Sequence, residues 1–196
     1  MKVLKINLLL LILFSLMTAI CYGQTAQDYY DKGIDYGVAG KFVKVQQEFT
    51  KALELDSFYT PAKVGLELVE DALKQRIKTR TALHLFGGIF YHNKGMYDEE
   101  IAEYKKAIEV DPNHADTHYN LGVVYGNKGM HDEAIREFKK TIEINPNYAD
   151  AYNNLAAAYY YKGEYSLAIT YCDRAIELGY RVYPKLLEFL EPYRKR

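Results

Sequence analysis

Two stretches of the chain are nearly the same text: KGMYDEEIAEYKKAIEVDPNH at residues 94–114 and KGMHDEAIREFKKTIEINPNY at residues 128–148. They lie 34 residues apart, and Gly95, Gly129 and Gly163 repeat at this spacing. A fixed period of this length indicates stacked repeats, because one such unit is too small to bury its apolar face alone. The sequence therefore predicts three units, at 81–114, 115–148 and 149–182.

Each unit predicts two helices joined by a tight turn. In the unit 115–148, apolar residues recur at helical spacing on both sides of Gly129. Glycine suits such a turn because it adopts positive φ without strain. Asn145-Pro146 then ends the second helix, since proline cannot continue it. Gly122 is small where two helices would cross closely.

These units resemble tetratricopeptide repeats, whose pattern is an aromatic residue, Leu-Gly, Tyr, Ala, an aromatic, Ala and Pro. The resemblance implies an all-α solenoid of antiparallel helix pairs that ends in a capping helix, and a role in binding other proteins. In the unit 115–148 the pattern is carried by His118, Leu121, Gly122, Tyr125, Ala134, Phe138, Thr141 and Pro146.

The flanking segments fit the pattern less well. Residues 24–59 are interpreted as a degenerate first repeat, with Lys32 in place of the usual leucine. Residues 60–80 predict one inserted helix that starts at Thr60-Pro61 and ends in the basic run from Lys74 to Arg80. The sequence leaves open whether it kinks the solenoid or packs as an unpaired helix. Residues 183–196 predict the capping helix and a basic tail.

Residues 1–23 predict a secretory signal peptide. Lys2 and Lys5 precede an uncharged run of 13 residues, 8–20, which is too short to span a membrane. Cleavage after Gly23 gives a periplasmic or secreted protein. A minority alternative is a lipoprotein anchored at Cys21, and this anchor is then the protein's one link to a membrane.

Composition excludes several function classes. Hydrophobic residues make up 49% and charged residues 26%, which excludes wholesale disorder. The formal net charge is −1, and it becomes −3 once Lys2 and Lys5 leave with the signal. No basic excess predicts a nucleic-acid partner. The 20 tyrosines, with no tryptophan, suggest aromatic packing positions in the repeats.

No catalytic site is predicted. His114 and His118 are four residues apart, as in some helical metal pairs, but alanine follows the first histidine and no third ligand is identifiable. No phosphate-binding loop is present. We therefore expect no metal, no cofactor and no small-molecule substrate, and a metal-dependent enzyme is the hypothesis with the least support.

The family resemblance places ligand contacts on the first helix of each pair, in a concave groove. Asn120 and Asn154, 34 residues apart, resemble the asparagine ladder with which some members hold a peptide backbone, although the same residues also bond between repeats. The basic clamp for a carboxylate terminus is not matched. Asp116 and Asp150 at the edge favour an apolar or mildly basic peptide. The candidate groove residues are Phe86, Ile89, Tyr119, Asn120, Val123, Asn153, Asn154, Tyr160 and Tyr161.

The hypothesis that follows is an exported interaction module that binds a peptide segment or helix of another protein. The alternative is a structural subunit that helps to assemble a cell-envelope complex.

Overall fold

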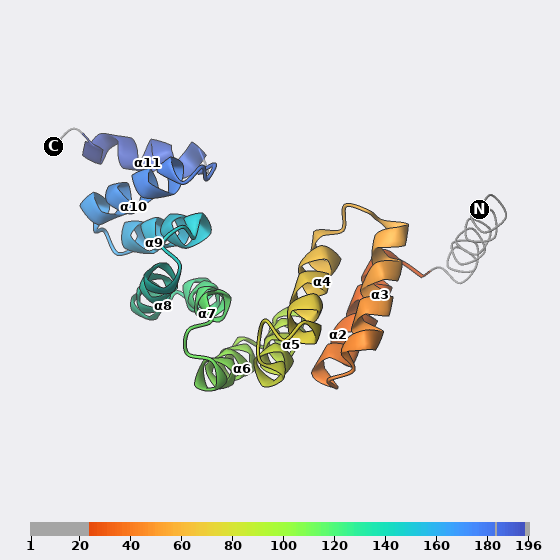
Figure 1. The fold of residues 1–196 in the computed structure, drawn as a ribbon. Coiled ribbons are helices and arrows are strands. Elements are labelled where there is room, and N and C mark those ends of the chain that lie inside the picture. Colours follow the sequence, from red (N-terminus) through yellow and green to blue (C-terminus); the bar gives the residue numbers. More distant parts are fainter. Residues whose placement is uncertain (1–23, 183, 195–196) are drawn as a thin grey trace. The chain divides into compact units, whose positions relative to one another are not determined.

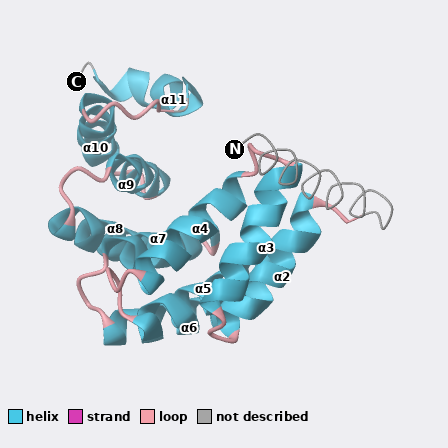
Figure 2. Cartoon of the chain, turned by 45° about the vertical axis from the view of Figure 1, so that its right-hand side comes forward, coloured by secondary structure: helices cyan, strands magenta, loops and turns pink. Residues whose placement is uncertain are grey.

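The computed structural model describes residues 24–182 and 184–194, and all regular structure within them is helical (Figures 1 and 2). The predicted all-α fold is confirmed. The predicted signal peptide and Cys21 lie outside the described residues. The chain divides into two compact units, one up to Phe90 and one from Tyr91 onward.

The first unit contains α2, α3, α4 and most of α5. A capping box starts α2, in which the Thr25 and Asp28 side chains each bond the other residue's backbone N–H. The helix α3 packs against both α2 and α4. The bounds are Ala26–Val38 for α2, Phe42–Leu55 for α3, Thr60–Leu73 for α4 and Thr79–Asn93 for α5.

Phe49 of α3 is the centre of this unit's core and is fully buried. Glycine faces its ring from two other helices: a Cβ added at Gly33 of α2 would lie 2.3 Å from the ring, and one at Gly65 of α4 2.2 Å. These helices approach closely because neither position carries a side chain. Tyr30 stacks on the same ring, with 5.4 Å between centroids.

The unusual Lys32 of the degenerate repeat has a partner. Its Nζ lies 3.4 Å from Oε2 of Glu48 on α3, while Lys51 approaches the other oxygen at 2.9 Å. Glu48 is only 5% exposed. Since a buried carboxylate needs a cation or hydrogen-bond donor, this pairing explains how a lysine is tolerated where the last two repeats carry Leu121 and Leu155.

The segment 60–80 differs from the single long helix that the sequence predicts. Helix α4 ends at Leu73, the chain turns through Gln75 at a φ of 57°, and α5 starts at Thr79. Arg76 bonds Asp71 and Lys74 bonds Glu70, so two of the four basic residues are neutralised locally. The turn stops the helix because the left-handed conformation breaks its hydrogen-bond ladder.

The second unit is a run of stacked helices, each of which packs on the next in sequence from α6 to α11. This arrangement confirms the predicted solenoid of helix pairs with a C-terminal helix. Leu190 of α11 is fully buried. The bounds are Tyr97–Val110 for α6, Ala115–Asn127 for α7, His131–Ile144 for α8, Ala149–Tyr161 for α9, Tyr165–Glu177 for α10 and Pro184–Arg194 for α11.

The turns repeat as predicted. Gly95, Gly129 and Gly163 have φ angles of 68°, 73° and 76° and join the two helices of successive pairs. Within the pair α7 and α8, a Cβ at Gly122 would lie 2.7 Å from the Phe138 ring. This confirms that Gly122 permits a close helix crossing.

An exposed ion pair also repeats with the 34-residue period. Lys128 pairs with Asp98 of the preceding repeat, and Lys162 pairs in the same way with Asp132 at 2.7 Å. The pairs link the turn of one repeat to the second helix of the repeat before it. Within residues 24–182 and 184–194, none of the helices is both long and apolar enough to cross a membrane.

Candidate functional site

The candidate site lies on α7 and α9, the first helices of two successive pairs, which contact each other. On each helix a row of exposed or half-buried side chains lies along one side. We call this surface the first-helix face. It consists of Asp116, Tyr119, Asn120 and Val123 on α7, and of Tyr148, Asp150, Asn153, Asn154 and Tyr160 on or next to α9.

Tyr119 connects the two helices. Its ring stacks on Tyr148 at 4.9 Å between centroids, and its hydroxyl accepts a hydrogen bond from Nδ2 of Asn154 at 3.1 Å. Burial and then the nearby carboxylate of Asp150 raise the pKa of Tyr119 to about 12. The phenol therefore stays protonated at physiological pH and can donate a hydrogen bond.

The sequence did not point to Tyr148 as a site residue. It lies just before α9, where it is the N-cap residue, and its ring completes the aromatic pair with Tyr119. Burial, followed by the charge of Asp116 and a hydrogen bond to it, raises the pKa of Tyr148 well above its ordinary value. The signal in the sequence was its place two residues after Pro146, at the junction with the next repeat.

The asparagines are used partly within the protein. Asn154 donates to Tyr119, and Asn153 donates from Nδ2 to Oδ1 of Asn154 at 3.3 Å. The structure shows no hydrogen bond from the half-buried Asn120 side chain to any described residue. Asn154 therefore bonds between neighbouring repeats, while the side-chain amide of Asn120 is available for a hydrogen bond to a partner. A ladder that holds a partner's backbone stays a prediction.

Tyr160 and Tyr161 lie two turns further along α9 and pack on different neighbours. The Tyr160 ring stacks on Phe189 of α11 at 5.7 Å, so it extends the first-helix face toward the C-terminal helix. The Tyr161 ring stacks on His131 at 5.1 Å but is still 70% exposed. Tyr161 thus lies at the edge of the repeat stack.

Phe86 is not a surface residue, and the prediction that it lines a binding groove is wrong. It is fully buried in the first unit, where a Cβ at Gly37 would lie 2.4 Å from its ring. The ring fills the space that this glycine leaves, so a partner cannot reach it. Ile89, also on α5 in the first unit, is half-buried. A role of Ile89 in binding stays a prediction.

His118 has both ring nitrogens bonded within the protein. Nδ1 lies 2.7 Å from a Glu137 carboxylate oxygen, and Nε2 lies 3.0 Å from the carbonyl of Pro112. Burial lowers the pKa of His118, but these two acceptors outweigh it and leave the pKa raised. His114 bonds Thr117 instead, at 2.8 Å. In the described part of the chain, no cluster of three or more potential ligands could hold a metal ion.

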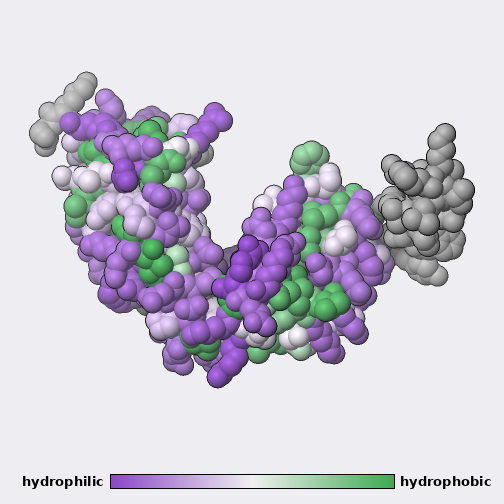
Figure 3. Space-filling model, viewed as in Figure 1, coloured by the Kyte–Doolittle hydropathy of each residue, from purple (hydrophilic) through white to green (hydrophobic). Residues whose placement is uncertain are grey.

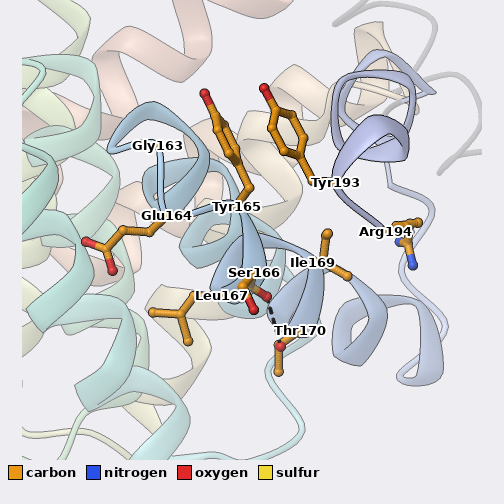
Figure 4. Close-up of a pocket in the computed structure, with 9 residues that line it drawn as sticks. All are labelled: Gly163, Glu164, Tyr165, Ser166, Leu167, Ile169, Thr170, Tyr193 and Arg194. Atoms are coloured by element: carbon orange, nitrogen blue, oxygen red, sulfur yellow. Dashed lines mark hydrogen bonds between the residues drawn. The ribbon is translucent and has the colours of Figure 1, made fainter. Parts of the chain in front are cut away.

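A cavity of about 650 Å³ lies elsewhere in the second unit, over the start of α10 and the end of α11 (Figure 4). Tyr165 and Tyr193 stand side by side at one end of it, with 3.8 Å between ring centroids. Arg194 at its rim makes two bonds to Asp173, at 2.6 and 3.0 Å. The carboxylate that lines the cavity, Glu164, is likewise paired, with Lys162 at 2.9 Å, so both charged groups of the lining already have partners.

Comparison with known families locates the repeats. A TPR repeat model matches residues 90–129, and a tetratricopeptide repeat model matches residues 115–148 and 149–178. The chain therefore contains tetratricopeptide repeats in the part that forms the first-helix face. A comparison with curated proteins found no significant match.

Two solved structures with TM-scores of 0.53 and 0.50 agree on the fold. The TPR2B domain of yeast Sti1, in a complex with pHsp70, is 22% identical with a TM-score of 0.53, and the match covers 60% of this chain and all of that one. A MamA structure is 24% identical with a TM-score of 0.50, over 75% of this chain and 94% of that one. YrrB, described as a TPR protein with an unusual peptide-binding site, is 20% identical over 93% of this chain and 98% of its own, at a TM-score of 0.49.

Proposed function

We propose that the protein is an exported interaction module that binds a peptide segment or helix of another protein on its first-helix face. The observation that carries the proposal is the Tyr119–Tyr148 pair, flanked by the unbonded amide of Asn120. Tyrosine and asparagine suit protein recognition because they combine contact area with adaptable hydrogen bonding. The repeats support this role, since stacked helix pairs present a preformed binding surface.

Binding on this face needs no catalysis and little rearrangement. The rings are held by packing on their neighbours, so little conformational entropy is lost when a partner binds. In the view of Figure 3, hydrophobic residues of the second unit form small separate patches on a mostly hydrophilic surface. A mixed polar and aromatic contact therefore fits the side of the unit seen in this view better than a large apolar one.

The test is selection of a phage-displayed library of random linear peptides on the purified protein. Asn120→Ala should weaken binding of an enriched peptide by about three- to tenfold, because a ligand hydrogen bond is lost. The triple variant Asn120→Ala, Asn154→Ala and Tyr160→Ala should weaken it further. Lys105→Ala, on the exposed side of α6, is the matched control and should bind as the wild type does.

Circular dichroism of each variant reports whether the helices remain. Unchanged affinity in a folded triple variant would remove the first-helix face from consideration. Export has its own test, which is cell fractionation followed by N-terminal sequencing. A mature chain that starts at Gln24 supports the signal peptide, one that starts at a lipidated Cys21 supports the lipoprotein, and a cytoplasmic full-length chain rejects both.

A second hypothesis is that the protein is an assembly subunit with permanent contacts. Exposed apolar side chains on α10 and α11 favour it, since Phe189 is 49% exposed and Leu167 38%. Light scattering separates the two hypotheses. A subunit of this kind should self-associate or purify with its complex, whereas a peptide binder should be monomeric at micromolar concentration.

A further inference from the structure

The two helices that form the first-helix face are poor in positive charge, because their one histidine, His118 of α7, is buried and bonded to Glu137. Neither α7 nor α9 contains a lysine or an arginine, although the helices that pack behind them carry several. Each of the two helices has an aspartate as its second residue, and these residues, Asp116 and Asp150, are 34 positions apart. The two aspartates are the formal charges of this face, so the face is acidic.

These two carboxylates differ from most others in the second unit. Asp132 pairs with Lys162, Asp173 with Arg194 and Glu177 with Arg174. Asp116 and Asp150 are exposed, and no described lysine, arginine or histidine lies within ion-pair distance of either. Their charge is therefore available to a partner.

An aromatic surface lies beside the two carboxylates. Asp116 lies three residues before Tyr119 on α7, and Asp150 follows Tyr148 by two residues at the start of α9, so both carboxylates lie near the stacked rings. The charges of both carboxylates also raise the pKa of Tyr148. Tyr148 stacks on Tyr119, which places two ring edges and faces next to the negative charges. A cation is attracted both by a carboxylate and by the face of a tyrosine ring.

We propose that the segment bound on the first-helix face is basic, and that one of its lysine or arginine side chains lies between Asp116 and Asp150 against the Tyr119–Tyr148 pair. This inference rests on the proposed function and names the chemistry of its partner. A partner carboxylate is excluded from the same place because it would meet two like charges and no cation. Nucleic acid is repelled for the same reason.

The peptide selection described above tests the inference directly. Peptides enriched on the wild-type protein should share a lysine or arginine at one position. The double variant Asp116→Asn and Asp150→Asn keeps the side-chain shape and an acceptor for Tyr148 but removes both charges. We expect it to bind a synthetic enriched peptide about tenfold or more weakly by calorimetry.

The matched control is Glu99→Gln with Glu109→Gln, which removes two exposed carboxylates of α6 and changes the net charge equally. It should leave affinity within about twofold of the wild type. Raising salt from about 0.05 to 0.5 M should weaken binding to the wild type and to this control, but much less to the double asparagine variant, because salt screens the removed interaction. Exchange of the peptide's arginine for lysine shows which cation is preferred.

The outcomes separate the two proposals. Peptides that need Asn120 but carry no conserved basic residue, and that bind the aspartate variant equally well, overturn the basic partner and leave the proposed function standing. Peptides that bind regardless of substitutions on the first-helix face overturn the proposed function and the inference together. Equal losses of peptide affinity in the aspartate variant and in the glutamate control also overturn the inference, because they reveal a nonspecific effect of net charge.

Discussion

Asn154 on one repeat donates its amide hydrogen to the hydroxyl of Tyr119 on the repeat before it, across 3.1 Å. The two residues are 35 positions apart in the chain, one more than the period, so the bond joins neighbouring first helices. A residue placed to meet a ligand thus also holds the binding surface together. Substitutions here have effects on stability that must be measured before effects on binding are interpreted.

Tyr119→Phe should lower the free energy of unfolding by about 0.5–1.5 kcal/mol. The change removes the hydroxyl that accepts from Asn154, while the stacking on Tyr148 remains. Urea unfolding followed by circular dichroism measures the effect. Tyr161→Phe is the control, because its ring is largely exposed, and we expect a change of less than about 0.5 kcal/mol. Equal effects of the two substitutions would contradict a structural role for the bond.

Two glycines on α7 should respond oppositely to alanine. A Cβ at Gly122 would meet the buried Phe138 ring, so Gly122→Ala should destabilise the protein by about 1–3 kcal/mol. A Cβ at Gly126 meets nothing within 4 Å, and alanine favours a helix, so Gly126→Ala should stabilise by about 0.5–1 kcal/mol. Thermal unfolding of both variants checks the pair. The close crossing is refuted if Gly122→Ala unfolds at the wild-type temperature.

Stability should fall with rising pH because of His118. Its pKa is raised in the folded protein, so protonation favours folding. The stabilisation is fully present below the unfolded value of about 6.5 and is lost as the pH rises through the folded pKa. Urea unfolding at a series of pH values measures this. In His118→Gln that part of the pH dependence should disappear, and a pH profile identical to that of the wild type would show that other groups cause it.

Phe86→Ala should destabilise the first unit by about 3–5 kcal/mol, because a fully buried ring is removed and leaves a cavity. Ile89→Ala, at a half-buried position on the same helix, should cost clearly less. Where the variant is still folded, peptide affinity should match that of the wild type. Weakened binding with unchanged stability would restore Phe86 as a contact residue.

The repeat pattern predicted the local features of the fold well. The turn glycines and the crossing at Gly122 follow from residues that recur every 34 positions, because each repeat packs two helices against each other in the same way. The pattern failed for Phe86, since it assigns residues to the surface by their position in an ideal repeat. In the first unit, Phe86 of α5 packs against Gly37 of α2, and the 34-residue periodicity does not describe that contact.

Within the repeats at 81–182, the sequence by itself determined the helices, the turns and the order in which they stack, because these depend on local periodicity and on glycine and proline at fixed places. It also showed that the first helices of the second unit carry aspartate and neither lysine nor arginine. Only the tertiary structure decided that Tyr148 completes an aromatic pair with Tyr119, that His118 bonds Glu137, and that Lys32 pairs with Glu48. These contacts depend on how the faces of neighbouring helices meet, and spacing along one helix does not specify that.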